Sequence, residues 1–475
     1  MNSYEPREES VAIIGAGLVG CLAALNFAKL GYYVTLFELR DDPRLRDTTD
    51  KNLRSINLAV SERGIKSLNY VDLEMSLRVL SKIVPMRARM VHDLEGNQKS
   101  IPYGLHGETI NSIDRGFLNV ELLNEIDMNN NIQILFGLKL VKLDFNKKNN
   151  DNPIVYFQSN KKKDDDISNP IQSYEFDFVV GADGAYSQTR FQLQKFIRMN
   201  FEQEYIDTAY IELVIPPGKK NSYQLDPQHL HIWPRENFML MAMPNHDGSF
   251  TSTFFGPWDL LKNLNNDEKV LGFFQTNFPD SINLIGLQKL LYAFKYHPKG
   301  ALVCTFCDPY NYKGKCIIIG DAAHSMVPFY GQGMNCGFED VRVLTDLLKK
   351  HNFTTELAFQ EYSETRNKDL IAIINLAKEN YKEMSQRVNT QQFQIRKTID
   401  NLLYRILGDK WLPLYTMVSF RNDIPYSEAI RRGRKQYNII TGIQIGVATV
   451  GILAGYKYSR SLFSSFTNMI IKSLK

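Results

Sequence analysis

Three glycines near the start of the chain stand at the spacing used to bind a dinucleotide. The run from Gly15 to Gly20 reads G-x-G-x-x-G. In such a turn the first glycine allows a tight exit from a strand, and the second lets backbone N–H groups approach a pyrophosphate. The third lets the following helix pack closely on the sheet. Glu38 follows 18 residues after Gly20, where a carboxylate would accept hydrogen bonds from ribose hydroxyls and repel a 2′-phosphate. The pattern therefore predicts a dinucleotide site that disfavours NADP.

Two further motifs that contain glycine and aspartate could contact the same ligand. Residues 181–190 read GADGAYSQTR, and residues 320–335 read GDAAHSMVPFYGQGMN. A single Asp-Gly pair is usually only a turn, so their order and spacing carry the significance. Gly331 and Gly333 would let the chain pass tightly beneath a flat ring, and a helix starting at Met334 would stabilise negative charge on it. We expect His324 to pack and hydrogen-bond beside that ring, and we assign no catalytic acid or base.

Buried strands and helices must position these motifs. Continuous apolar strands beside the motifs are typical of a parallel sheet covered on both faces. Alternating segments in the middle of the chain predict a separate antiparallel sheet. The expected parallel strands are 11–14, 34–38, 178–180 and 315–319, and the expected antiparallel strands are 205–215, 229–233 and 238–242. Helices are expected at 21–30, at 334–350 and across 354–430, and the polar stretch 146–173 is expected to form a solvated hairpin without a functional role.

The three motifs, in this order, resemble the FAD-dependent aromatic hydroxylases with a single Rossmann domain, of the 4-hydroxybenzoate hydroxylase type. Within that class, further segments are similar to the kynurenine 3-monooxygenase family. The resemblance extends from about residue 8 to residue 430. The segments that carry it are RSINLA at 54–59, PMRARM at 85–90, IPYG at 101–104, HIWPR at 231–235, the whole of 320–335 and LPLYTMV at 412–418.

The resemblance implies an α/β fold. In it, a Rossmann-type FAD-binding domain carries an inserted antiparallel β-sheet substrate domain, followed by a C-terminal helical region and a C-terminal membrane helix. The implied FAD-binding domain is discontinuous and consists of 8–80, 108–195 and 300–350. The implied substrate domain consists of 81–107 and 196–299, the helical region of 351–430 and the membrane helix of 438–456.

The resemblance also implies an activity. NADPH would reduce a tightly bound FAD, and O₂ would add to it as a C4a-hydroperoxide. One oxygen would then pass to L-kynurenine, giving 3-hydroxykynurenine in the kynurenine pathway of tryptophan degradation. The chain has no second Rossmann fingerprint, which fits transient rather than resident binding of the nicotinamide. Because the aniline nitrogen already makes the ring nucleophilic, the protein would mainly position the ring and exclude water.

Individual residues match the family's contacts. The substrate has an amino-acid carboxylate, which Arg89 would bind as a two-pronged pair while Tyr103 donates its hydroxyl to the same group. The substrate residues implied are Arg89, Tyr103, Pro328, Phe329, Asn380 and Tyr415. The cofactor residues implied are Gly15, Gly17, Val19, Gly20, Phe37, Glu38, Leu39, Arg40, Ala59, Arg115, Leu140, Asp183, Asp321, Met334 and Asn335.

The positive charge of the chain is concentrated at its end. The formal net charge of the 475 residues is +4, but residues 429–475 contain eight Lys or Arg and no Asp or Glu, so the rest is slightly acidic, at −4. This body offers no basic surface for nucleic acid. Residues 438–456 are uncharged with basic flanks, and as a helix they would extend about 28 Å, close to the thickness of a bilayer core. We expect a membrane anchor, and the resemblance implies the mitochondrial outer membrane with the body facing the cytosol.

The five cysteines and eight histidines form no familiar metal pattern. Cys304 and Cys307 make one C-x-x-C without a second pair, so we expect no metal site, and scattered cysteines indicate a reducing compartment. Two alternatives stay open. One is another hydroxylase of this fold, of the quinone-pathway or phenol type, and the other is a flavin-free binding protein like the GDP-dissociation inhibitors.

Overall fold

A six-stranded sheet forms the first layer of the fold. The computed structural model describes residues 6–45, 57–149, 151–160, 170–387, 391–446 and 449. Strands β1 (Ser10–Ile14), β2 (Tyr33–Phe37), β8 (Ile132–Leu135), β12 (Phe178–Gly181) and β19 (Cys316–Ile318) run parallel, and β18 (Asn311–Tyr312) closes one edge antiparallel. Because β1 and β12 are buried throughout most of their length, the sheet needs helices on both faces, as the continuous apolar strands predicted.

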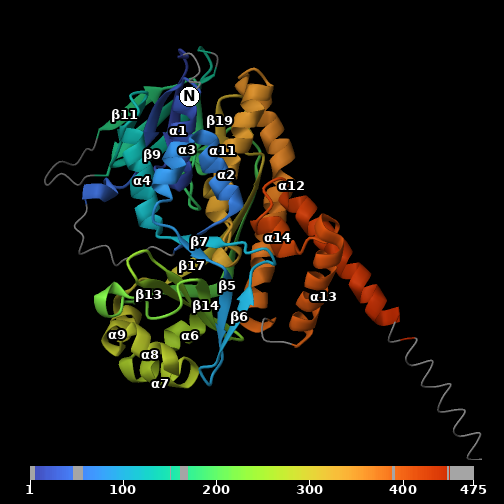
Figure 1. Ribbon diagram of the computed structural model, residues 1–475. Helices are drawn as coiled ribbons and strands as arrows, with labels where there is room; N and C mark the ends of the chain where they lie inside the picture. Colours follow the sequence, from blue (N-terminus) through green and yellow to red (C-terminus); the bar gives the residue numbers. More distant parts are fainter. Residues whose placement is uncertain are drawn as a thin grey trace, which may run out of the picture.

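Helices cover this sheet and place the glycine turn. Helix α1 (Leu18–Lys29) begins directly after Gly17, three residues before the expected start, and packs on α4 (Arg115–Asp127) and α11 (Gly333–Lys350). Next to them lie α2 (Glu62–Val71) and α3 (Leu73–Val79) (Figure 1). Gly15 has φ +102°, a conformation that side chains rarely adopt, and this lets the chain reverse from β1 into α1.

A seven-stranded sheet forms the second layer, in the order β17-β13-β16-β15-β14-β5-β6. Its central strands β13 (Asn200–Ile215), β14 (His229–Arg235), β15 (Phe238–Pro244) and β16 (Phe250–Gly256) are antiparallel neighbours. The alternating segments predict the first three, and no prediction covers β16. β5 (Ala88–His92) lies parallel to β14, and β6 (Gln98–Pro102) returns beside it. The resemblance implies that residues 300–350 belong to the FAD-binding domain, whereas β17 (Gly300–Asp308) pairs with β13 and is the edge strand of this sheet.

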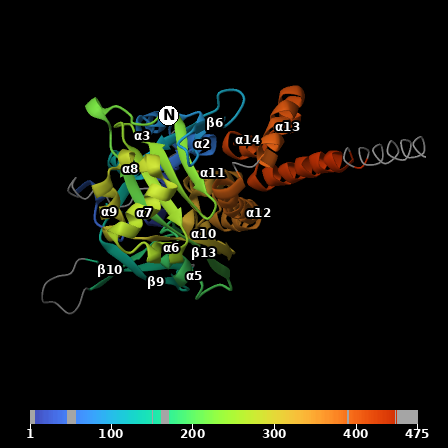
Figure 2. The same ribbon diagram turned by 90° about the horizontal axis from the view of Figure 1, so that it is seen from below.

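Four short helices close the outer face of the second sheet. They are α6 (Trp258–Asn263), α7 (Asp267–Asn277), α8 (Pro279–Ile285) and α9 (Leu287–Tyr296) (Figure 2). Trp233 and Phe254 of the sheet are fully buried against Phe274 and Phe278 of these helices, in a core separate from that of the first layer. The other face of the sheet is thereby left to face the first layer.

Two three-stranded sheets complete the body. One has the order β3-β7-β4, from β3 (Leu58–Val60), β7 (Ile110–Ile113) and β4 (Val84–Met86). The other joins β9 (Leu138–Asn146), β10 (Asn152–Ser159) and β11 (Ile171–Glu175), so the polar stretch 146–173 extends a regular sheet, while 161–169 lies outside the described residues. Phe157 of β10 stacks on Phe37 at 4.0 Å between ring centres, which ties this sheet to the end of β2.

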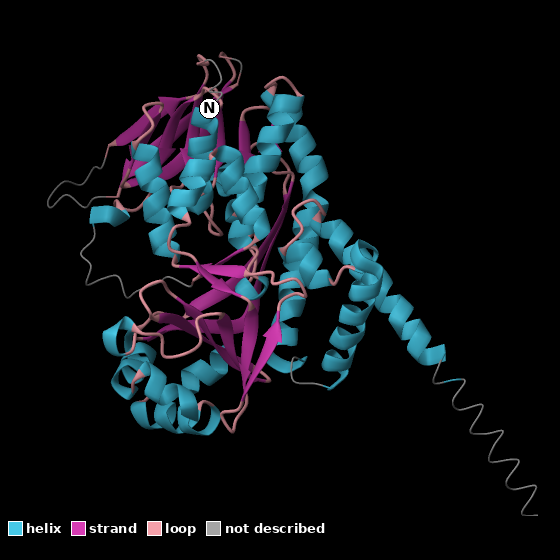
Figure 3. Cartoon of the chain, in the orientation of Figure 1, coloured by secondary structure: helices cyan, strands magenta, loops and turns pink. Residues whose placement is uncertain are grey.

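The C-terminal part is helical, as expected. Helices α12 (Thr355–Lys382), α13 (Gln391–Leu407) and α14 (Leu414–Ser419) run along the side of both strand layers (Figure 3). A last helix starts at residue 426 and is described to residue 446. None of the helices in the described part of the chain is both long enough and apolar enough to cross a membrane. The second half of the predicted span 438–456 lies, except for Thr449, outside the described residues.

Candidate active site

A large cavity, of about 500 Å³, lies between the two layers. At one end it is bounded by Gly15 and Gly17 after β1, Glu38 after β2 and Asp183 after β12. These residues stand at the carboxyl ends of neighbouring parallel strands, which is where open α/β sheets bind ligands. At the other end lie residues of β5, β15 and β16 from the second sheet.

Most of the residues assigned to the cofactor line this cavity. Those that do are Gly15, Gly17, Val19, Phe37, Glu38, Leu39, Arg40, Ala59, Arg115, Leu140, Asp183, Asp321 and Met334. Gly20 and Asn335 are not among the lining residues. A Cβ at Gly20 would lie 1.8 Å from the carbonyl oxygen of Gly15, so this glycine lets α1 close on the turn. The Asn335 amide donates to the carbonyls of Ala59 and Gly331, 2.7 Å from each, and its oxygen accepts from the backbone N–H of Ser61. Both residues shape the cavity from behind.

The acidic residues at the dinucleotide end hold the backbone turns. Glu38 accepts hydrogen bonds from the backbone N–H groups of Ala16 (2.8 Å) and Arg40 (3.0 Å), so it ties β2 to the glycine turn. Asp183 accepts from the Ser187 hydroxyl (2.5 Å) and the Thr189 N–H (2.9 Å) at the start of α5 (Gln188–Leu193). Burial raises the pKa of Asp183, and these hydrogen bonds oppose the rise. Contacts of either carboxylate with a ribose remain predictions.

The shape of the glycine turn fits a bound pyrophosphate. Gly17 has the ordinary backbone angle φ −73°, and a Cβ built on it would meet no atom within 4 Å. Nothing in the fold of the chain therefore requires glycine there, and the free space faces the cavity. Helix α1 starts at this point with no acidic residue in its first turn, so its N–H groups and its dipole favour an anion. These features match the chemistry of FAD.

Arg89 dominates the other end of the cavity. Its side chain comes from β5, and the residue is only 9% exposed. The centre of its guanidinium lies 5.0 Å from the ring centre of Tyr415 and 5.7 Å from that of Tyr103. Its Nε has no hydrogen-bond partner among the described residues. Burial alone would lower the pKa of Arg89, but Tyr415, Tyr103 and Glu383 raise it, so the guanidinium is a permanently charged donor for a carboxylate.

The remaining substrate residues divide into two groups. Pro328 and Phe329 line the cavity, as do Tyr103 and Tyr415. Asn380 is not among the lining residues, and its contact with the substrate stays a prediction. Its buried amide donates to the carbonyl oxygen of Phe329 at 2.6 Å. Asn380 therefore positions the segment that carries Phe329, and its amide is engaged before any substrate binds.

The sequence reasoning missed most of the apolar wall. That wall includes Met86, Leu230, Met241, Met243, Phe255, Tyr330 and Met384, together with Thr251 and Thr253. On β15 and β16 the lining residues alternate, because one face of the sheet looks into the cavity and the other into the helices α6–α9. The period-two pattern, which predicts the strand at 238–242 and no strand at β16, is the available signal. It does not say which of the two faces meets a ligand.

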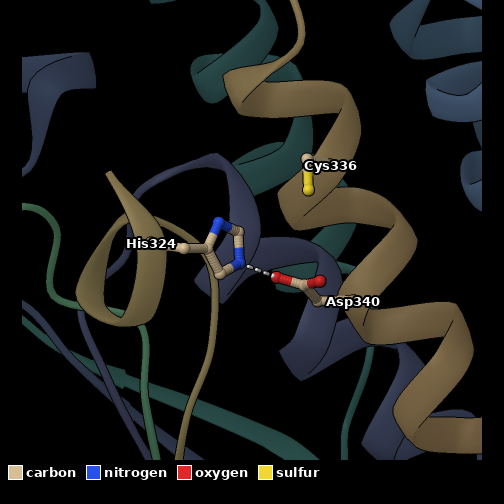
Figure 4. Close-up of side chains that lie close together, drawn as sticks. All are labelled: His324, Cys336 and Asp340. Carbon is tan, nitrogen blue, oxygen red and sulfur yellow. Dashed lines mark hydrogen bonds and ion pairs between the residues drawn. The ribbon is translucent and has the colours of Figure 1, made fainter. Parts of the chain in front are cut away.

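His324 belongs to a buried ion-pair cluster behind the cavity. Its Nε2 is hydrogen-bonded to Asp340, and Cys336 lies beside them (Figure 4). Asp340 also accepts from the Gly320 N–H (3.0 Å) and from Nε of Arg366 (3.0 Å). These three side chains are close enough for a shared metal, but the Arg366 guanidinium contacts Asp340 and reaches 3.5 Å from the Cys336 sulfur. The guanidinium group of Arg366 supplies the positive charge at this position. The cluster therefore fits a packing and hydrogen-bonding role for His324.

Comparisons with known proteins agree with this geometry. Residues 146–368 match the family described as "FAD binding domain", and residues 2–73 match "Pyridine nucleotide-disulphide oxidoreductase". The fold is similar to that of 2-methyl-3-hydroxypyridine-5-carboxylic acid oxygenase, with a TM-score of 0.63 and 17% identity over 89% of this chain and 98% of that one. Fold, cavity and family match together define a FAD-binding oxidoreductase with the fold of this oxygenase.

Curated relatives narrow the class. The kynurenine 3-monooxygenase of Candida albicans is 52% identical over 95% of this chain and 97% of its own. The kynurenine 3-monooxygenase of Debaryomyces hansenii is 52% identical over 94% of this chain and 95% of its own. The enzyme of Saccharomyces cerevisiae is 50% identical over 96% of this chain and 98% of its own. The chain belongs to the kynurenine 3-monooxygenase family. The two alternatives left open by the sequence, a hydroxylase of another type and a flavin-free binding protein, gain no support from these matches.

Proposed function

We propose that this protein hydroxylates L-kynurenine to 3-hydroxykynurenine, with FAD as the bound cofactor and NADPH and O₂ as co-substrates. The observation that carries the proposal is the position of Arg89. This buried, charged donor lies at the far end of the cavity whose other end has the glycine turn of a dinucleotide site. One cavity thus offers a place for a flavin and a place for a carboxylate-bearing aromatic compound.

Different lining residues would bind different parts of the substrate. Arg89 would bind the amino-acid carboxylate in a two-pronged pair, and Tyr103 and Tyr415 would offer hydroxyls beside it. Phe329 and Met241 would enclose the aniline ring between the carboxylate site and the flavin. Bound FAD supplies the oxygen-transfer chemistry. The chain itself orients the ring and keeps water out of the apolar part of the cavity.

The proposed flavin contacts follow from the same cavity. The backbone at Gly17 and the start of α1 would hold the pyrophosphate, and Asp321 at the start of α10 (Asp321–His324) would face the ribityl chain. Helix α11, which begins beside Met334, would direct its N-terminus to the pyrimidine edge of the flavin. That position favours the negative charge of the reduced flavin.

One experiment tests class and substrate together. The purified holoenzyme is mixed with NADPH without oxygen, with and without L-kynurenine, and the loss of flavin absorbance is followed. We expect L-kynurenine to accelerate reduction, and with oxygen present we expect stoichiometric 3-hydroxykynurenine. A protein without flavin, or a flavin whose reduction and oxygen use do not respond to L-kynurenine, would contradict the proposal.

We also propose that the end of the chain binds the protein to a membrane, by our prediction the mitochondrial outer membrane. The helix that starts at residue 426 points away from the body (Figure 1, red). Along it, Tyr437, Ile439, Ile443 and Ile445 are exposed apolar side chains. Exposed isoleucines on a protruding helix, with Arg431 to Lys435 before them, are typical of a segment that meets a bilayer surface.

A further inference from the structure

A carboxylate that the proposed function does not yet use lies beside Arg89, behind the residues that line the charged end of the cavity. Glu383 is the first residue of η5 (Glu383–Arg387), directly after α12. Its Oε1 lies 3.8 Å from a terminal nitrogen of Arg89. Among the described residues, no other carboxylate forms an ion pair with Arg89. The acidic residues that line the cavity, Glu38, Asp183 and Asp321, stand at the dinucleotide end.

The contact between Arg89 and Glu383 is loose. At 3.8 Å it is an ion pair without a hydrogen bond, and Nε of Arg89 has no partner. The Glu383 side chain is 37% exposed, while that of Arg89 is nearly buried. A carboxylate placed only to neutralise a buried arginine gains most from a short bidentate contact. Here the two charged groups lie side by side, and within the described part of the chain neither Nε of Arg89 nor the carboxylate of Glu383 forms a hydrogen bond that a ligand would have to displace.

A second cation makes this carboxylate important. Lys397 of α13 donates from Nζ to the carbonyl oxygen of Pro102 at 2.9 Å, next to Tyr103, and its charge acts on Arg89 and Glu383. Without Glu383, the described residues would place two positive charges, those of Arg89 and Lys397, and no negative charge at this end of the cavity. Such a site would attract a carboxylate but repel an ammonium group on the neighbouring atom.

We propose that Glu383 receives the α-ammonium group of the substrate and thereby selects an amino acid over an aromatic acid that lacks the amino group. The inference rests on the proposed function, and it names the part of L-kynurenine that the function leaves unassigned. An α-amino acid carries its carboxylate and its ammonium on one carbon. The two groups that bind them must therefore stand next to each other, as Arg89 and Glu383 do.

The test compares two substrates in one variant. The first is L-kynurenine, and the second is 4-(2-aminophenyl)-4-oxobutanoate, which has hydrogen in place of the α-amino group. The variant Glu383→Gln keeps the size of the side chain and removes its charge. We divide kcat/KM for L-kynurenine by kcat/KM for the analogue. In Glu383→Gln we expect this ratio to fall about tenfold or more, because a charge-assisted contact is lost for L-kynurenine alone. Flavin content should stay unchanged.

The control is Glu379→Gln, one turn earlier on α12, where the side chain is exposed. It should leave the ratio unchanged. If Glu383 only holds Arg89 in place, Glu383→Gln will lower kcat/KM equally for both compounds. The ratio will then equal the wild-type ratio, which would overturn the inference. If the wild-type protein hydroxylates neither compound, the proposed function itself fails, so the two failures are distinguishable.

Discussion

Tyr103 and Tyr415 stack with their ring centres 5.4 Å apart and their planes 11° from parallel. Tyr103 follows β6, and Tyr415 comes from α14 near the end of the body. Between them they place two aromatic rings against the guanidinium of Arg89. Burial raises the pKa of both tyrosines, so their hydroxyls keep their protons and can donate at neutral pH. The carboxylate site that we propose therefore needs the C-terminal helices, because one of its two tyrosines comes from α14.

Replacing Arg89 should weaken the binding of L-kynurenine and leave the binding of FAD unchanged. In Arg89→Ala, each charged hydrogen bond lost to the carboxylate costs about 1.5–3 kcal/mol of binding free energy. We expect a large increase in the Kd of L-kynurenine, measured by flavin fluorescence, with normal FAD content. The matched control is Arg87→Ala on the same chain segment, where the arginine is exposed. An unchanged Kd in Arg89→Ala would remove its assigned role.

Two glycines of the same turn should respond differently. Gly17→Ala adds a methyl group where the chain has free space. The free energy of unfolding of the apo protein should therefore stay within about 1 kcal/mol of the wild-type value. FAD should be lost, since the methyl group occupies the approach to the pyrophosphate. Gly20→Ala places its Cβ against the Gly15 carbonyl and should reduce the yield of folded protein. Flavin absorbance per folded protein, with chemical unfolding, separates the two effects. Full flavin occupancy in Gly17→Ala would contradict the proposed pyrophosphate site.

Substrate binding should depend on the protonation of Lys397. Burial, and then the positive charge of Arg89, lower the pKa of Lys397 to about 8, and Glu383 partly opposes the shift. Above this pH the lysine loses its charge, so the attraction for a carboxylate should weaken and the KM of L-kynurenine should rise. Lys397→Arg stays charged, and its KM should rise less over the same range. Because both enzymes meet the same titrating substrate, an identical pH profile would refute this role.

The buried ion network should carry much of the stability of the C-terminal region. Glu339 accepts hydrogen bonds from Arg63 and Arg366, at 2.9 Å each, and Arg63 also donates to the Val418 carbonyl behind Tyr415. Glu339→Gln leaves the buried guanidinium of Arg63 without the carboxylate it pairs with, while Arg366 keeps Asp340, and we expect a loss of about 3–5 kcal/mol in the free energy of unfolding. The exposed Glu364→Gln should change it by less than about 0.5 kcal/mol. Equal stabilities in a denaturant titration would show that the network contributes little.

Removing the end of the chain should separate attachment from activity. A protein ending at residue 446 keeps the exposed isoleucines but lacks the second half of the predicted span 438–456. A larger share of it should therefore stay in the soluble fraction, with unchanged turnover. Ending it at residue 428 should also lower activity, since Gln436 donates to the Leu412 carbonyl and Ile440 is buried against the body. These contacts lie close to α14, which carries Tyr415. If the full-length protein is already in the soluble fraction, the proposed attachment is wrong.

Local patterns were sufficient for much of the fold. The apolar run before Gly15, the glycine spacing and the acidic Glu38 predict a strand, a turn, a helix and a second strand, because each depends on neighbouring residues. The structure has this unit as β1, α1 and β2. The alternating strands of the second sheet followed from the same kind of pattern. The boundary at residue 300 did not, since the pairing of β17 with β13 depends on a partner far away in the chain.

The sequence by itself determined two features of the site. They are the glycine turn of a dinucleotide site and a set of polar residues typical of the family. Only the tertiary structure decided which of those residues reach the cavity. Asn380 matched the substrate contacts, yet its amide is bound to Phe329, and Glu383, three residues later, lies beside Arg89. The physical reason is that a helix turns 100° at each residue, so small differences in its packing decide which side chain faces a ligand. The opposition of Arg89, Tyr103 and Tyr415 likewise arises where separate elements pack together, and no local pattern contains it.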